Sequence, residues 1–221
     1  MINTEDQEQL FRLIAEYLER DLVCVAIGGT AMMFMGYKNA TKDIDLVFDS
    51  KQERDVFIRA IKELGYADKA LSGIYDAKRT AHPGKPLMFT RGEERFDLFV
   101  HDIFGYMLST KDAFTERRDY LGKSEFIVHL PTKEDLILLK AITRREKDHE
   151  DIAAIIKADT SIDWSALVEK AAMQAAHNEW FLIDLEATLQ DLKKMAFIPN
   201  KHFRRIYEAQ ERLHGGSSGK N

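Results

Sequence analysis

The 221-residue chain contains one cysteine, Cys24, and no long apolar run. A single cysteine excludes an intramolecular disulfide and a zinc site built from several thiolates. The seven histidines are scattered, without a paired metal-binding motif such as H-E-x-x-H. The longest apolar runs, such as Val23–Ile27 and Leu136–Leu139, are far too short to span a bilayer. We therefore expect no membrane partner.

The chain also lacks a strong excess of positive charge, because its net charge is −5. Phosphate binding needs clustered cations, so the composition does not indicate a general nucleic-acid binder, although it does not exclude a local basic groove. Glu5, Asp6 and Glu8 stand where a secretory signal would be basic, and no apolar segment follows them. A cytoplasmic location is expected. Apolar residues make up 45% and charged residues 31%, the balance of a folded domain.

Capping boxes, glycines and apolar spacing predict alternating helices and strands in the first part of the chain. In order, the expected elements are a helix opening at Thr4-x-x-Gln7, a strand Leu22–Ile27, a short buried helix Thr30–Met35, a strand Asp43–Phe48, and a helix opening at Ser50-x-x-Glu53 and ending before Gly65. A loop over Tyr66–Pro86, hairpin strands Pro86–Thr90 and Arg95–Val100, and a strand Ser124–Leu130 follow.

From Pro131 onward the sequence is helical almost to its end. We therefore predict an α/β (α+β) fold, in which a mixed sheet flanked by helices precedes an all-helical C-terminal half. The expected boundaries are an α/β domain at residues 1–130, a helical domain at 131–214 and a flexible Gly/Ser tail at 215–221.

Asp43 and Asp45 are the most informative acidic residues. Residues i and i+2 of a strand share one face and lie roughly 7 Å apart at Cα. Carboxylates so placed can hold metals about 3.5–4 Å apart, as in two-metal phosphoryl-transfer sites. Mg²⁺ prefers carboxylate and phosphate oxygens. Asp97 supplies a third carboxylate from another apolar strand; alone, such acids also fit a solvated strand face.

The segment Gly28-Gly29-Thr30 stands between a predicted strand and a predicted helix. Glycine lets the backbone approach a phosphate closely, and free N–H groups at a helix start attract anions. The Thr30 hydroxyl can either cap the helix or donate to a phosphate oxygen. A diglycine turn alone is weak evidence, because such turns are common. Its position just before Asp43 and Asp45 makes it informative.

The sequence from Gly28-Gly29-Thr30 to Thr41-Lys42-Asp43-Ile44-Asp45-Leu46 resembles the signature of the polymerase-β-like nucleotidyltransferase superfamily. The resemblance implies that Gly28, Gly29 and Thr30 bind the triphosphate. It also implies that Asp43 and Asp45 bind Mg²⁺ or Mn²⁺ and that Asp97 completes the site, with Asp102 and Glu94 as alternatives to Asp97. The stretch Gly36-Tyr37-Lys38 with Thr41 and Asp43 looks like the AbiEii/MenT-like toxin subgroup.

The segment Glu134–Ile142 is apolar almost all round as a helix and is expected to be buried. Lys140 in its middle must reach solvent, pair with an acid or serve a site. The charge run from Arg144 to Ile152 would ordinarily be solvated. Together these residues resemble later motifs of the AbiEii-like group, which implies that Lys140 contacts the triphosphate and that Asp148, or alternatively Asp151, orients it or the acceptor.

Further along the chain the sequence shows no recognisable motif. The apolar positions expected to form helical core are Trp164, Leu167, Ala171, Trp180, Leu182 and Leu185.

The resulting prediction is a Mg-dependent nucleotidyltransferase that transfers a nucleoside monophosphate from a nucleoside triphosphate to a hydroxyl acceptor. Relatives modify RNA or tRNA ends, proteins or small hydroxyl compounds, so the acceptor stays open, as do a toxin role and a cognate antitoxin as partner. One alternative is a catalytically inactive nucleotide-binding or antitoxin-like module. Another is a metal-dependent nuclease, which the Gly28-Gly29 turn makes less favoured.

Overall fold

The computed structural model describes residues 1–69, 84–143, 145–175, 177–178 and 180–215. Internal contacts divide the chain into unit 1, Met1–Thr132, and unit 2, Lys133–Asn221. This division lies close to the boundary near residue 130 that the sequence suggests. Most of the predicted loop before Pro86, Arg144 of the charge run, and the Gly/Ser tail after Gly215 lie outside the described residues.

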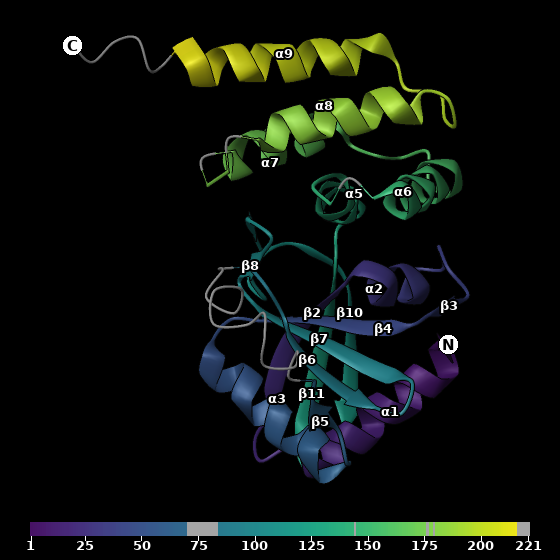
Figure 1. Cartoon of the computed structure of the whole chain (residues 1–221), viewed down its shortest axis with the longest axis vertical. Coiled ribbons are helices and arrows are strands. Elements are labelled where there is room, and N and C mark those ends of the chain that lie inside the picture. The colour runs from purple at the N-terminus through teal and green to yellow at the C-terminus, as the bar shows by residue number, and fades with distance from the viewer. Residues whose placement is uncertain (70–83, 144, 176, 179, 216–221) are drawn as a thin grey trace, which may run out of the picture. The chain divides into compact units, whose positions relative to one another are not determined.

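Unit 1 is built on a mixed sheet, which in the described residues has nine strands with β10-β11-β2-β4-β7-β6-β5 as its main order (Figure 1). Its strands are β2 (Leu22–Ile27), β4 (Asp43–Phe48), β5 (Ala67–Asp68), β6 (Leu87–Arg91), β7 (Glu94–Val100), β8 (Asp102–Ile103), β9 (Tyr106–Met107), β10 (Phe114–Leu121) and β11 (Glu125–Pro131). In the centre, β4 runs antiparallel to β2 and parallel to β7. A separate ribbon pairs β1 (Ile2–Asn3) with β3 (Ala40–Thr41).

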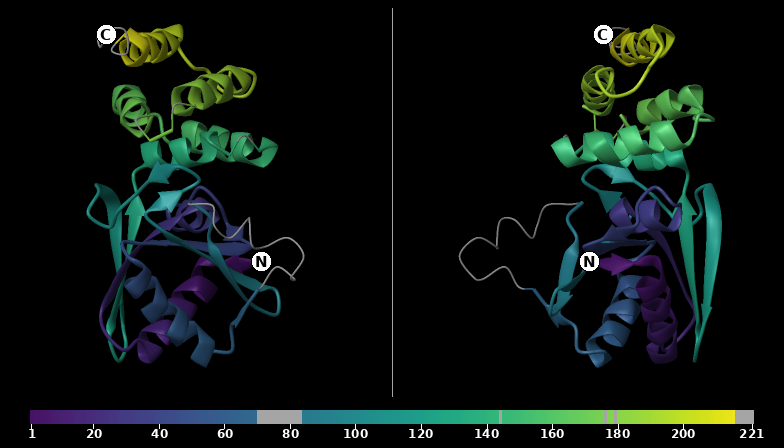
Figure 2. Two further views of the ribbon diagram at one scale, coloured as in Figure 1. Left: turned by 60° about the vertical axis from the view of Figure 1, so that its left-hand side comes forward. Right: turned by 90° about the vertical axis from the view of Figure 1, so that its right-hand side faces the viewer.

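Helices α1 (Thr4–Tyr17) and α3 (Lys51–Glu63) pack side by side against one face of this sheet (Figure 2). That face carries the alternate apolar residues of β4 and β7, including Ile44 and Phe96, which are fully buried. Alternation turns Asp43, Asp45 and Asp97 to the opposite face. The short helix α2 (Gly28–Phe34) follows β2 directly and contacts β4. The predicted fold class, a mixed sheet flanked by helices followed by helical sequence, is confirmed.

Three local predictions need correction. Helix α1 is capped by Asn3, whose side chain accepts from the Asp6 backbone N–H, so its capping box begins one residue before Thr4. Strand β5 lies within the segment predicted as a loop, where it extends the β6–β7 hairpin. Strand β10 was not predicted, because as an edge strand it is largely exposed and its charged run lacks apolar alternation.

Unit 2 consists, in its described residues, of the helices α5 (Lys133–Ala141), α6 (Glu146–Ala158), α7 (Trp164–Gln174), α8 (Phe181–Leu192) and α9 (Asn200–Gly215). Helix α5 is buried from Glu134 to Ala141, as its apolar sequence predicts. Of the predicted core positions, Leu167, Ala171, Leu182 and Leu185 are buried. Trp164 is half-buried and stacks on His202, and Trp180 is 57% exposed. Assigning Trp180 to the core was therefore wrong. Among the described helices, none has the length and apolarity that crossing a membrane would require.

Candidate functional site

The turn from β2 into α2 brings the glycine segment against β4. Gly28 has φ +58°, a left-handed conformation that favours glycine. A Cβ at this position would lie 2.5 Å from Asp45 Oδ2, which is too close for a side chain. The backbone angle therefore favours glycine here, and a side chain would have to displace the Asp45 carboxylate. The predicted convergence of the diglycine turn and the aspartate strand is present.

The Thr30 hydroxyl binds the backbone of β4. It accepts a hydrogen bond from the Asp45 N–H at 3.1 Å and donates to the Asp43 carbonyl at 3.4 Å. Thr30 is fully buried, and the N-cap of α2 is Ile27, without a side-chain hydrogen bond. Thr30 therefore does not cap the helix. It joins α2 to the aspartate strand, and its predicted contact with a phosphate stays a prediction.

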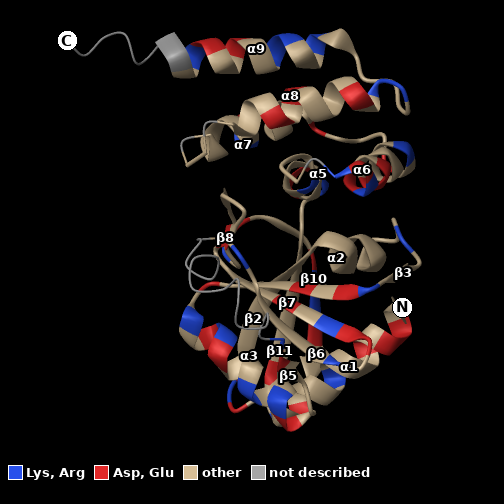
Figure 3. Cartoon of the chain, viewed as in Figure 1, with Lys and Arg blue, Asp and Glu red and all other residues tan. Residues whose placement is uncertain are grey.

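The parallel register of β4 and β7 sets three carboxylates on one face. Asp45 stands opposite Asp97, and Asp43 stands opposite Arg95. Because Arg95 and Asp97 are two residues apart on β7, both side chains share the face of the β4 aspartates. Figure 3 shows the resulting mixture of acidic and basic segments on these strands. The structure thus brings Asp43, Asp45 and Asp97 to neighbouring positions, as strand alternation predicts for the first two and the resemblance implies for Asp97.

Arg95 lies between two of these carboxylates. Its Nη2 donates to Asp43 Oδ2 at 2.6 Å and to Asp97 Oδ2 at 3.0 Å. Burial raises the pKa of Asp97 above its usual value, Arg95 opposes this shift, and the nearby Asp43 carboxylate adds to it. Three neighbouring carboxylates and one guanidinium give this face an excess of negative charge.

The donor set fits a divalent cation only in part. Within the described ranges, no three acidic, histidine or cysteine side chains are grouped closely enough to hold a metal as they stand. Asp97 Oδ1, however, is buried and accepts no hydrogen bond from the described residues. Asp45 Oδ2 faces the bare Gly28. Carboxylate oxygens are the donors that Mg²⁺ and Mn²⁺ prefer, so the chemistry of the three aspartates suits either ion.

Glu94 and Asp102, the two alternatives to Asp97 as the third carboxylate, bind groups outside the candidate site. Glu94 lies on the opposite face of β7, where its carboxylate accepts from Tyr66 Oη at 2.5 Å and pairs with Arg91. Asp102 accepts from the Gly105 N–H at 2.7 Å in the turn between β8 and β9. Asp97 is thus the third carboxylate that shares a face with Asp43 and Asp45.

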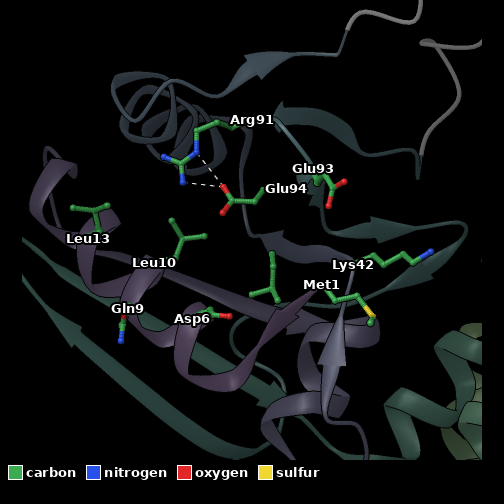
Figure 4. Close-up of a pocket in the computed structure, with 10 residues that line it drawn as sticks. Met1, Asp6, Gln9, Leu10, Leu13, Lys42, Arg91, Glu93 and Glu94 are labelled. Atoms are coloured by element: carbon green, nitrogen blue, oxygen red, sulfur yellow. Dashed lines mark hydrogen bonds and ion pairs between the residues drawn. The ribbon is translucent and has the colours of Figure 1, made fainter.

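A pocket of about 590 Å³ opens near the start of β4, lined by residues that include Leu10, Lys42 and Glu94 (Figure 4). Leu10 belongs to α1, which covers the core face of the sheet, and Glu94 points to that same face. The pocket therefore lies on the side of the sheet away from Asp43 and Asp45 and is separate from the candidate site.

In unit 2, Lys140 is buried with two acidic partners. Its Nζ lies 2.6 Å from Asp151 Oδ2 and 3.3 Å from Asp148 Oδ1. Asp148 also accepts hydrogen bonds from Thr143 and Arg145. Burial would raise the pKa of Asp148, but these two bonds and the Lys140 charge outweigh it and hold the pKa below its usual value. The sequence leaves three possibilities for Lys140: it reaches solvent, pairs with an acid or serves a site. The structure shows that Lys140 pairs with both Asp148 and Asp151.

We expect Lys140→Ala to lower the free energy of unfolding by about 3 kcal/mol, because it would remove the buried cation that Asp148 and Asp151 share. Equilibrium urea unfolding measures this. The matched control is Lys194→Ala, since Lys194 lies 3.9 Å from Asp191 in an exposed pair, whose removal costs at most about 1 kcal/mol. Equal stability of the two variants would contradict the structural role of Lys140. The contact of Lys140 with a triphosphate, implied by resemblance, stays a prediction.

Arg95 is the residue of this site that the sequence analysis missed. The sequence contains a signal for it, because Arg95 and Asp97 flank Phe96 in a predicted strand and so share one strand face. Thr41 was quoted only as part of a motif, yet its hydroxyl donates to the Asp43 carbonyl at 3.0 Å. Arg95 thus binds the aspartate side chains, and Thr41 binds the backbone of their strand.

The glycine turn thus meets a pair of strands that carries three carboxylates on one face. A family model described as a nucleotidyltransferase of unknown function (DUF6036) matches residues 6–197. The match covers most of the chain, which therefore belongs to this family. The prediction of a nucleotidyltransferase-type protein is confirmed at this level; the AbiEii/MenT-like subgroup stays a prediction. None of the curated proteins compared with the chain matches it.

Proposed function

We propose that the protein transfers a nucleoside monophosphate from a nucleoside triphosphate to a hydroxyl acceptor, with Mg²⁺ or Mn²⁺ as cofactor. The observation that carries this proposal is the approach of Gly28 to Asp45 on the strand face where Asp45 stands opposite Asp97. The space that a side chain would fill at Gly28 and Gly29 is taken by Asp45 and Thr41, so the Asp45 carboxylate lies directly against the turn to which the resemblance assigns the triphosphate. Membership of the nucleotidyltransferase family supports the same reaction class.

In the proposed reaction, the acceptor oxygen attacks the α-phosphorus in line. The new bond joins this oxygen to phosphorus, the bond from phosphorus to the bridging oxygen breaks, and pyrophosphate leaves with that electron pair. Asp43, Asp45 and Asp97 would hold the divalent cation, which when bound neutralises charge on the attacking and leaving oxygens. The Asp97 carboxylate lies on the same face and would receive the hydroxyl proton. Thr30 and Thr41 keep the backbone of β4 in place through their hydroxyl groups.

Labelled nucleotides test this proposal directly. The purified protein is incubated with each labelled triphosphate, Mg²⁺, and either total RNA or protein lysate. We expect label in a macromolecular fraction and release of pyrophosphate, with one triphosphate preferred. Label at the 3′ ends of tRNA would identify RNA as the acceptor, whereas label on a protein would identify a protein acceptor. Either acceptor is one that a toxin of this type would modify, and a toxin would have a cognate antitoxin as partner.

Two other outcomes would contradict the proposal. Mg-dependent triphosphate binding without any turnover would favour the inactive nucleotide-binding or antitoxin-like module. Cleavage of nucleic acid in the absence of a triphosphate would favour the metal-dependent nuclease.

A further inference from the structure

One side chain, Arg95, spans two of the carboxylates to which the proposed function assigns the metal. The parallel register of β4 and β7 places Arg95 beside Asp43, and Asp97 follows Arg95 on the same face. Arg95 Nη2 contacts a carboxylate oxygen of each aspartate, at 2.6 Å and 3.0 Å. A positive group thus lies between Asp43 and Asp97, where it offsets the repulsion between two like charges.

The contact between Arg95 and these carboxylates is imperfect. Arg95 Nε lies 3.0 Å from Asp97 Oδ1, yet neither atom forms a hydrogen bond of acceptable geometry with any described residue. A well-matched arginine and carboxylate form two parallel hydrogen bonds. Here one nitrogen, Nη2, serves two carboxylates instead. The geometry leaves a buried acceptor on Asp97 that a better-suited cation could use.

Arg95 can also leave without disturbing the core. The side chains of Arg95 and Asp43 are 32% and 33% exposed, and that of Asp97 is 12% exposed. The guanidinium therefore has a route to solvent, whereas the apolar residues that fix the two strands lie on the other face. Once the guanidinium has moved out, a divalent cation can reach the carboxylate oxygens that it contacted.

We propose that the Arg95 side chain occupies the metal position in the free protein. It holds the Asp43 and Asp97 carboxylates together in the free protein, and a divalent cation must displace it to bind. This inference rests on the proposed function. Metal binding to the free protein is weakened by the displacement of Arg95. A triphosphate, which brings its own oxygen ligands, restores strong binding, so the metal enters together with the nucleotide.

The test measures Mn²⁺ binding by electron paramagnetic resonance, first without nucleotide and then with a non-hydrolysable triphosphate. Without nucleotide, we expect Arg95→Met to bind Mn²⁺ at least about tenfold more tightly than wild type, with a smaller further gain from the triphosphate. Lys42→Met is the matched control, because it removes a positive charge next to Asp43 in the chain without removing the bridge. It should change Mn²⁺ affinity by no more than about twofold.

The outcomes separate this inference from the proposed function. If wild type and Arg95→Met bind Mn²⁺ equally, Arg95 is not an occupant of the metal position, and the proposed reaction is unaffected. If Lys42→Met tightens binding as much as Arg95→Met, the effect is general charge, and the inference is wrong. If neither wild type nor Arg95→Met binds Mn²⁺, even with the triphosphate, the metal site itself fails and the inference fails with it.

Melting temperatures show whether the Arg95→Met variant is folded. Without metal, Arg95→Met should melt below wild type, because Asp43 and Asp97 then repel each other. Mn²⁺ should raise its melting temperature more than that of wild type. If Arg95→Met does not fold, Arg95→Lys provides the test, since an ammonium keeps the charge but lacks the planar fork. Its Mn²⁺ affinity should exceed that of wild type; an affinity equal to or below wild type would contradict the inference.

Discussion

Asp45→Ala is expected to abolish nucleotide transfer while the melting temperature stays close to that of wild type. Asp45 would hold the cation beside the glycine turn, where negative charge develops on the triphosphate in the transition state. Losing one such electrostatic contact typically lowers the rate by about a hundredfold to a thousandfold, and losing a metal ligand should cost at least that. Its carboxylate is partly exposed and forms no part of the apolar core.

Pyrophosphate release and thermal unfolding, measured on the same preparation, check this expectation. Asp119→Asn is the control, because Asp119 is an aspartate of the edge strand β10 paired with Arg117 at the surface. It should keep both activity and stability. A folded Asp45→Ala protein with full activity would overturn the proposed metal site.

Gly28→Ala is expected to lower transfer by at least about a hundredfold, comparable to the loss of Asp45. The new Cβ would meet Asp45 Oδ2 at 2.5 Å, so the carboxylate must move away from the turn where the triphosphate is to bind. The left-handed backbone at Gly28 adds a conformational cost of roughly 1–2 kcal/mol for alanine. Both activity and stability should therefore fall.

Gly92→Ala separates these two causes. Gly92 has φ +59°, almost the same as Gly28, but nothing lies within 4 Å of its added Cβ. Unfolding free energies and initial rates of transfer are compared for both variants. Gly92→Ala should lose stability by a similar backbone cost and keep its activity. If the two variants lose activity equally, or Gly28→Ala stays fully active, the close approach to Asp45 is irrelevant to transfer.

Apolar patterns and helix caps in the sequence are sufficient to predict most of the fold. The strand Leu22–Ile27 occurs with the bounds of its β-prone apolar run, and Asp43–Phe48 with the bounds of its apolar alternation. The helix after Ser50 begins at the predicted cap, where the Ser50 side chain accepts from the Glu53 N–H. Such features depend on neighbours in the chain, so local sequence is sufficient to predict them. Trp180 shows the limit, because its exposure depends on the packing of α7 and α8 rather than on its own apolar character.

The amino-acid sequence by itself determined which groups are available for chemistry: two aspartates on one strand face, a diglycine turn before them, and a lysine inside an apolar helix. Strand alternation is a property of the backbone, so the shared face of Asp43 and Asp45 needs no tertiary information.

Only the tertiary structure decided which of these groups meet. The register of β4 on β7, set by packing of the whole sheet, selected Asp97 over Glu94 and placed Arg95 between two carboxylates. The packing of α5 on α6 gave Lys140 two acidic partners. Contacts between distant segments depend on the free energy of the complete fold, which no local pattern contains.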